Sequence, residues 1–113
     1  MRLLPSLRQK KRYVVFEIIS ATSFSFADIQ EEVHQALSSF WGQLGIARAG
    51  PLIIKERFNA SKQRFVIKVN NAYVDELKTG LALSKKIKNT AVIIRSITTS
   101  GTLKKAGLYI DKE

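Results

Sequence analysis

Residues 52–69 decide the fold, as a strand-like run Leu52-Ile-Ile-Lys-Glu-Arg-Phe58, a polar cluster Asn59-Ala-Ser-Lys62 and a second run Gln63-Arg-Phe-Val-Ile-Lys-Val69. Two runs rich in β-branched and aromatic residues that flank a short polar turn are typical of a β-hairpin. We therefore expect two antiparallel strands, residues 52–58 and 63–69, in the middle of the chain.

A helix and a strand are predicted before this hairpin. Apolar residues recur at spacings of three and four and would form one helical face: Ile29, Val33, Ala36, Leu37, Phe40 and Trp41. The acidic side chains fall in the first turns, where the helix dipole favours them: Asp28, Glu31 and Glu32. Gly42, Gly45 and Gly50, followed by Pro51, predict the end of the helix and a loop. Further upstream, the run RYVVFEII at residues 12–19 predicts a first strand.

A second helix and a fourth strand are predicted after the hairpin. Asn70 or Asn71 can cap a helix that continues through Ile87, with Gly80 as a weak point inside it. Residues 91–97 then form a β-rich run. The hydroxyl residues of 99–102 precede a short basic stretch, which we expect to make one or two helical turns.

The predicted element order is βαββαβ. That order favours an α+β, ferredoxin-like or RNA-recognition-like sandwich, in which a four-stranded antiparallel sheet carries two helices on one face. The other face of the sheet would be open and available for binding. We divide the chain into a basic N-terminal arm (residues 1–11), a ferredoxin-like RNA-binding domain (residues 12–106) and a short C-terminal tail (residues 107–113).

The charge of the chain indicates a polyanionic partner. The 113 residues contain 19 Lys and Arg against 9 Asp and Glu, a net charge of +10. Residues 1–12 and 77–110 contain no acidic residue, whereas residues 13–50 contain four and a single arginine. Two long acid-free stretches favour RNA binding over the alternative that these are solvated lysines conferring solubility. The absence of cysteine and of a long apolar run predicts a cytoplasmic protein.

No self-contained active site is evident in the sequence. The single histidine, His34, has no second histidine with which to bind a metal, and the Gly42-Gln-Leu-Gly45 segment lacks the lysine of a phosphate-binding loop. RNA recognition motifs stack bases on two aromatic rings of the third strand, but here Gln63 stands where the second ring is needed beside Phe65. We therefore expect Phe65 in the core and an RNA contact made through charge and shape.

Several strings resemble archaeal ribonuclease P protein component 2, which is related to the Pop-five and Rpp-fourteen proteins of the eukaryotic enzyme. They are Arg12-Tyr-Val-Val-Phe-Glu, Phe40-Trp-Gly-Gln-Leu-Gly-Ile-Ala, Leu81-Ala-Leu and Ile94-Arg-Ser-Ile-Thr-Thr-Ser-Gly-Thr-Leu-Lys-Lys-Ala. The resemblance extends from about residue 12 to residue 106, and the Ser100-Gly-Thr-Leu-Lys-Lys ending is its most specific part.

The resemblance implies a protein subunit of an endoribonuclease that removes the 5′ leader of precursor tRNA. The chemistry would belong to the catalytic RNA and its Mg²⁺ ions, with no cofactor bound by the protein. The implied partners are ribonuclease P RNA, other ribonuclease P proteins and the barrel-shaped component 3 subunit, with which it would form a heterotetramer of two copies each. The alternatives are a ribosomal or other RNA-binding accessory protein, and a small-molecule regulatory domain of the same fold.

Two sets of residues are the candidates for these contacts. The predicted RNA-binding residues are the cations and hydroxyls of the basic segments: Arg8, Lys10, Lys11, Arg12, Arg57, Lys62, Arg64, Lys68, Arg95, Ser100, Thr102, Lys104 and Lys105. For Ser100 and Thr102, helix capping alone is an equally open role. The predicted protein-binding residues lie on the acidic helix and at its end: Glu31, Glu32, Phe40 and Trp41. A purely structural role of Trp41 in the core remains an alternative.

Overall fold

Strand β1 (Lys11–Ile19) lies inside a four-stranded antiparallel sheet, between β3 (Arg64–Asn70) and β6 (Ile93–Ser100). The short strand β2 (Leu52–Ile53) pairs with the far side of β3, which gives the strand order β2-β3-β1-β6. The computed structural model describes residues 10–112 of the chain. Strand order and directions agree with the predicted ferredoxin-like sandwich.

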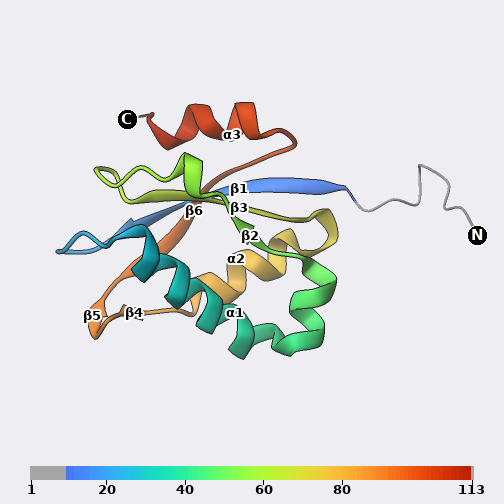
Figure 1. Cartoon of the computed structure of the whole chain (residues 1–113), viewed down its shortest axis with the longest axis horizontal. Helices are drawn as coiled ribbons and strands as arrows, with labels where there is room; N and C mark the ends of the chain where they lie inside the picture. The colour runs from blue at the N-terminus through green and yellow to red at the C-terminus, as the bar shows by residue number, and fades with distance from the viewer. Residues whose placement is uncertain (1–9, 113) are drawn as a thin grey trace, which may run out of the picture.

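One face of the sheet is covered by α1 (Phe26–Ala49) and α2 (Val74–Ala82), as Figure 1 shows. The main core fills the space between these helices and the sheet. Within it the rings of Phe16 and Phe65 stack with their centroids 5.6 Å apart, and both are almost fully buried. The predicted core position of Phe65 is confirmed.

The opposite face of the sheet is covered by a third helix, α3 (Leu103–Ile110) (Figure 1). Ala106 and Ile110 of this helix are buried against Val15 and Val66 of the sheet in a second apolar cluster. The expectation of an open sheet face is therefore wrong. Leu103, Ala106 and Ile110 recur at helical spacing and form an apolar stripe, which the lysines of this segment obscure in the sequence. The predicted boundary at residue 106 falls inside α3.

Helix α1 is broken at Gly42, where φ is +73°. The chain then continues as a second helical segment to Ala49 and ends at Gly50, whose φ of +61° is a left-handed cap and whose N–H donates to Ile46 O. Both angles lie in a region that L side chains rarely adopt. Gly42 thus ends the first part of the helix as predicted, but a helical segment occupies residues 43–49 where a loop was expected.

Two other elements are shorter than predicted. Strand β2 ends at Ile53, and residues 55–57 form one 3₁₀ turn, although the Asn59–Arg64 bridge still closes the hairpin. Helix α2 ends at Ala82 and not at Ile87, because the chain turns into a small hairpin of strands β4 (Lys86–Ile87) and β5 (Thr90–Ala91). Its two turn residues have positive φ, which excludes a continuing helix.

Candidate nucleic-acid interface

Basic residues from the two ends of the described chain meet beside α3. Tyr13 of β1 pairs with Ser100 of β6, which brings the start of β1 to the corner before α3. A guanidinium nitrogen of Arg12 lies 3.5 Å from the position that a Cβ on Gly101 would take. We call this surface the α3 rim and define it by Lys10, Arg12, Ser100, Thr102, Lys104 and Lys105; the ammonium group of Lys11 lies instead 3.6 Å from the position of a Cβ on Gly50, at the end of α1.

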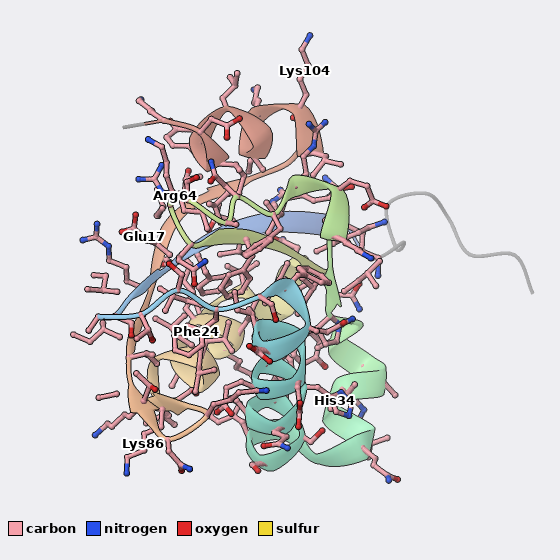
Figure 2. The ribbon with its side chains drawn as sticks, turned by 60° about the vertical axis from the view of Figure 1, so that its left-hand side comes forward. Glu17, Phe24, His34, Arg64, Lys86 and Lys104 are labelled. Atoms are coloured by element: carbon pink, nitrogen blue, oxygen red, sulfur yellow. The ribbon has the colours of Figure 1, made fainter. Side chains whose placement is uncertain are left out.

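The lysines of the α3 rim are exposed. Lys10, Lys104 and Lys105 form no ion pair within the described residues, and Figure 2 shows Lys104 pointing away from the protein. Lys11 is also exposed but donates a hydrogen bond to the side-chain oxygen of Asn70. These unpaired ammonium groups make the rim electropositive, which suits phosphate.

Arg57 extends the rim along α3. A Cβ on Gly107 would lie 3.6 Å from the central carbon of the Arg57 guanidinium, so this exposed group lies across the glycine. Lys68 pairs with Tyr13 across β1 and β3 and is half-buried, on the same side of the sheet as α3. Lys62 stands in the turn before β3, where its backbone N–H donates to Asn59 Oδ1 at 3.1 Å.

Thr102 is the N-cap of α3. Its hydroxyl oxygen accepts a hydrogen bond from the backbone N–H of Lys105 at 3.2 Å. The hydroxyl of Ser100 donates to Thr102 O at 3.1 Å and accepts from Thr102 N at 3.3 Å. The capping role is thus present in the structure, and RNA contact by these two hydroxyls stays a prediction.

Arg64 and Arg95 meet the same carboxylate, that of Glu17. Arg64 Nε lies 3.0 Å from Glu17 Oε2 and Arg95 Nη2 lies 2.7 Å from Glu17 Oε1. Burial raises the pKa of Glu17, but the hydrogen bonds and charges of the two arginines outweigh it and hold this pKa below its ordinary value. Figure 2 shows Glu17 and Arg64 close together under α3.

Arg64 also holds the end of α3. Its Nη1 donates to Tyr109 O at 3.0 Å and to Lys112 O, and its side chain is only 12% exposed. Because these donors are used inside the protein, the structure gives Arg64 a structural role and places it apart from the exposed cations. Arg95 is 60% exposed and keeps one side toward solvent. Arg8 lies outside the described residues.

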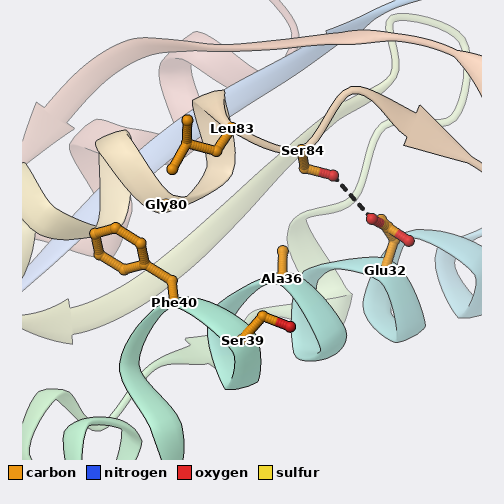
Figure 3. Close-up of a pocket in the computed structure, with 7 residues that line it drawn as sticks. All are labelled: Glu32, Ala36, Ser39, Phe40, Gly80, Leu83 and Ser84. Atoms are coloured by element: carbon orange, nitrogen blue, oxygen red, sulfur yellow. Dashed lines mark hydrogen bonds between the residues drawn. The ribbon is translucent and has the colours of Figure 1, made fainter.

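Two of the four predicted protein-binding residues, Glu32 and Phe40, lie where α1 meets α2. A cavity of about 310 Å³ opens between these helices, and Figure 3 shows its lining: Glu32, Ala36, Ser39, Phe40, Gly80, Leu83 and Ser84. Glu32 accepts a hydrogen bond from Ser84 Oγ at 2.8 Å at one end of this cavity. The ring of Phe40 lies at the other end and is 38% exposed.

Trp41 and Glu31 lie outside that cavity. The indole N–H of Trp41 donates to Glu76 Oε1 at 3.0 Å, and its ring packs edge-on against Tyr73 with centroids 6.1 Å apart. Trp41 is half-buried and contacts the main core, so it has the structural role that the sequence left open. Glu31 is exposed on α1.

The sequence interpretation missed one group of exposed cations, those of the β4–β5 hairpin: Lys85, Lys86 and Lys88. The acid-free stretch 77–110 contains the signal, but a helix predicted to continue through Ile87 gives no reason to expect an exposed basic hairpin here. Within residues 10–112, no three His, Asp or Glu side chains gather into a group that could hold a metal ion. No helix of this part of the chain is long and apolar enough to cross a membrane.

Comparison with known proteins points to one family. The model of the Rpp14/Pop5 family matches residues 12–110. The chain is 37% identical to "Ribonuclease P protein component 2" of Thermococcus kodakarensis and 35% identical to that of Pyrococcus furiosus, each over 103 residues that cover 91% of this chain and 84% of the relative. The protein of the same name from Methanosarcina barkeri is 34% identical over 105 residues, 93% of this chain and 75% of the relative.

A solved structure shows the same fold. A chain in the cryo-EM structure of yeast ribonuclease MRP superimposes with a TM-score of 0.65 at 13% sequence identity, covering 91% of this chain and 87% of that one. At this low identity the likeness concerns the fold alone.

Proposed function

The chain belongs to the Rpp14/Pop5 family of ribonuclease P proteins, and on this premise we propose that it binds and supports the catalytic RNA in removing the 5′ leader of precursor tRNA. The observation that carries the proposal is the α3 rim, where exposed cations without ion-pair partners gather on one side of the fold. In this proposal the protein neutralises phosphates and releases their counterions, while the RNA and its Mg²⁺ ions perform the chemistry.

The mode of RNA binding follows from the covered sheet. Phe65, which occupies the third-strand position of a stacking ring, is fully buried in the core. On the other side, α3 lies over Val15 and Val66 in the centre of the sheet. Bases therefore have no access to the middle of either sheet face, which supports recognition of the RNA backbone by charge and shape.

The second part of the proposal concerns a protein partner. We assign the cavity between α1 and α2 to the barrel-shaped component 3 subunit, in an assembly of two copies of each protein. The cavity is lined by apolar side chains and by the carboxylate of Glu32. Two of its lining residues, Leu83 and Phe40, are exposed to solvent. An exposed aromatic ring next to a concave apolar surface is typical of the centre of a protein interface.

Reconstitution tests the proposed function. Cleavage of precursor tRNA by the catalytic RNA at low Mg²⁺ is measured with and without this protein and its partner. Stimulation is expected, and its absence in an otherwise active mixture would refute the proposal. RNA binding without stimulation would instead support the alternative of another RNA-binding accessory protein.

The role of the α3 rim is tested with Lys104→Gln/Lys105→Gln. We expect its affinity for the catalytic RNA to fall about tenfold near physiological salt, and the slope of log K against log salt to decrease by about 2. Lys104→Arg/Lys105→Arg keeps both charges and is the matched control. An affinity that does not depend on salt would contradict phosphate binding.

A further inference from the structure

The β4–β5 hairpin carries exposed lysines far from the α3 rim. Lys85 and Lys86 are both exposed. Figure 2 places Lys86 and Lys104 at opposite ends of the molecule, with the sheet and the α1–α2 layer between them. The two basic regions are thus separate surfaces.

The hairpin is fixed to the core. Ile87 of β4 is only 1% exposed and belongs to the main core. Neighbouring side chains of a strand point in opposite directions, so the buried Ile87 directs Lys86 outward. The backbone N–H of Val92 donates to Lys85 O at 2.9 Å and closes the base of the hairpin. Lys85 and Lys86 therefore stand on an anchored element.

The lysines of the hairpin differ in their partners. Lys88 Nζ lies 2.8 Å from Asp28 Oδ1 in the first turn of α1, and this hydrogen bond lowers the pKa of Asp28 and raises that of Lys88. This pair attaches the turn to α1 and neutralises Lys88. Two more acids of α1 lie near the hairpin: the charge of Glu31 also raises the pKa of Lys88, and Glu32 accepts from Ser84. Lys85 and Lys86 form no ion pair within the described residues.

We propose that Lys85 and Lys86 form a second RNA-binding surface, so that one chain holds two separate RNA segments, one at the α3 rim and one at the hairpin. This inference rests on the proposed function, because it requires an RNA partner. Among residues 10–112, neither ammonium group has a carboxylate within ion-pair distance, and such groups bind phosphate by releasing its counterions. Leu83 and Ile93 are exposed near the hairpin, which makes a protein contact the competing outcome of the test.

Fluorescence anisotropy with the catalytic RNA, in which both proposed segments belong to one molecule, provides the first test. For Lys85→Gln/Lys86→Gln we expect an affinity loss of about tenfold near physiological salt and a salt slope smaller by about 2. Lys85→Arg/Lys86→Arg is the matched control and keeps the wild-type values. Circular dichroism confirms that each variant is folded. An unchanged affinity and slope for the Gln variant would overturn the inference.

A capture experiment tests whether the two surfaces hold two RNA segments. One duplex is immobilised, and the wild-type protein is expected to retain a second, fluorescent duplex on it. Lys85→Gln/Lys86→Gln and Lys104→Gln/Lys105→Gln should each lose this capture while still binding a single duplex. Capture that persists in the hairpin variant would show bridging by self-association and overturn the proposal.

The same experiments separate this inference from the proposed function. If the wild-type protein binds no RNA, the proposed function itself fails. If it binds RNA and the hairpin variant behaves as wild type, only the second surface is refuted. If the hairpin variant loses binding of the component 3 subunit and keeps its RNA affinity, the hairpin is a protein contact and the inference is likewise refuted.

Discussion

Glu17 of β1 lies directly opposite Arg64 of β3, and Arg64 Nε donates to Glu17 Oε2 at 3.0 Å. The same guanidinium reaches the carbonyl oxygen of Tyr109 at the end of α3. A single pair of side chains thus connects the sheet with the helix that covers it. Since Arg95 holds the other carboxylate oxygen, Glu17 stands between two cations.

Acidification is expected to weaken the fold through Glu17. Its pKa lies below the ordinary value of 4.5, so its contribution to stability is complete above that pH and is lost as the pH falls through the lowered pKa. Glu17→Gln should lower the free energy of unfolding at neutral pH by about 2 kcal/mol. Chemical denaturation between neutral pH and pH 3 should show wild type and variant converging in acid. Glu56→Gln, at an exposed position, is the control; a constant difference at all pH values would contradict this account.

Arg64→Lys keeps the charge but removes the fork that serves both Glu17 and Tyr109 O. A lysine has no second nitrogen with which to reach both groups, so we expect a loss of about 1–2 kcal/mol and faster hydrogen exchange in α3. The salt dependence of RNA binding should stay at the wild-type value. Arg48→Lys, at an exposed position, serves as the control. Unchanged exchange in α3 would show that Arg64 does not hold this helix.

Thr102→Ala should destabilise the protein by about 1 kcal/mol, because the N–H of Lys105 loses its cap. Thr102→Ser retains the hydroxyl and should remain close to wild type. Thermal denaturation of the three proteins measures the effect. Equal stabilities of the Ala and Ser variants would argue against capping.

Gly80 and Phe40 should show energetic coupling. A Cβ on Gly80 would lie 3.1 Å from Phe40 Cδ2, so Gly80→Ala forces the ring to move. In a Phe40→Ala background that conflict is absent, and the higher helix propensity of alanine should add up to about 1 kcal/mol. Denaturation of the four proteins gives the coupling energy. Additive effects would show that the contact imposes no constraint.

The single tryptophan provides a probe of the surface assigned to the component 3 subunit. Trp41 is held by Glu76 at the junction of α1 and α2, whereas the α3 rim lies on the other face of the sheet. We expect its emission to change when component 3 binds and to stay constant when RNA binds at the α3 rim. Trp41→Phe is the blank for the titration. A shift caused by RNA alone would contradict the assignment of these surfaces.

The regular pattern of the sequence was sufficient to predict the sheet and its two main helices. Alternating β-rich runs and the helical spacing of Ile29, Val33 and Leu37 are local signals, and these residues are buried as expected. The covered sheet face was not predictable from charge. Leu103, Ala106 and Ile110 form a short apolar stripe among lysines. Its partners are Val15 and Val66 on the sheet, and that these two side chains need a cover is evident only once the sheet is built.

The candidate site was predictable only in outline. Arg64 and Lys104 look alike in the sequence, but one is enclosed by Glu17 and two carbonyl groups while the other is exposed. That difference depends on strand register and on where α3 lies, which are properties of the tertiary structure. The cations of the β4–β5 hairpin were hidden for another reason, because Lys88 and Asn89 adopt left-handed backbone angles where a helix was expected.

The central position of β1 has a consequence for synthesis on the ribosome. Its neighbours arrive late: Arg64 and Arg95, which bind Glu17, follow it by 47 and 78 residues. Until residue 100 has left the exit tunnel, one edge of β1 has no partner, and unpaired edges are sites of aggregation. The sheet therefore cannot close around β1 before β6 has been synthesised, and we expect its folding to follow the emergence of residue 100.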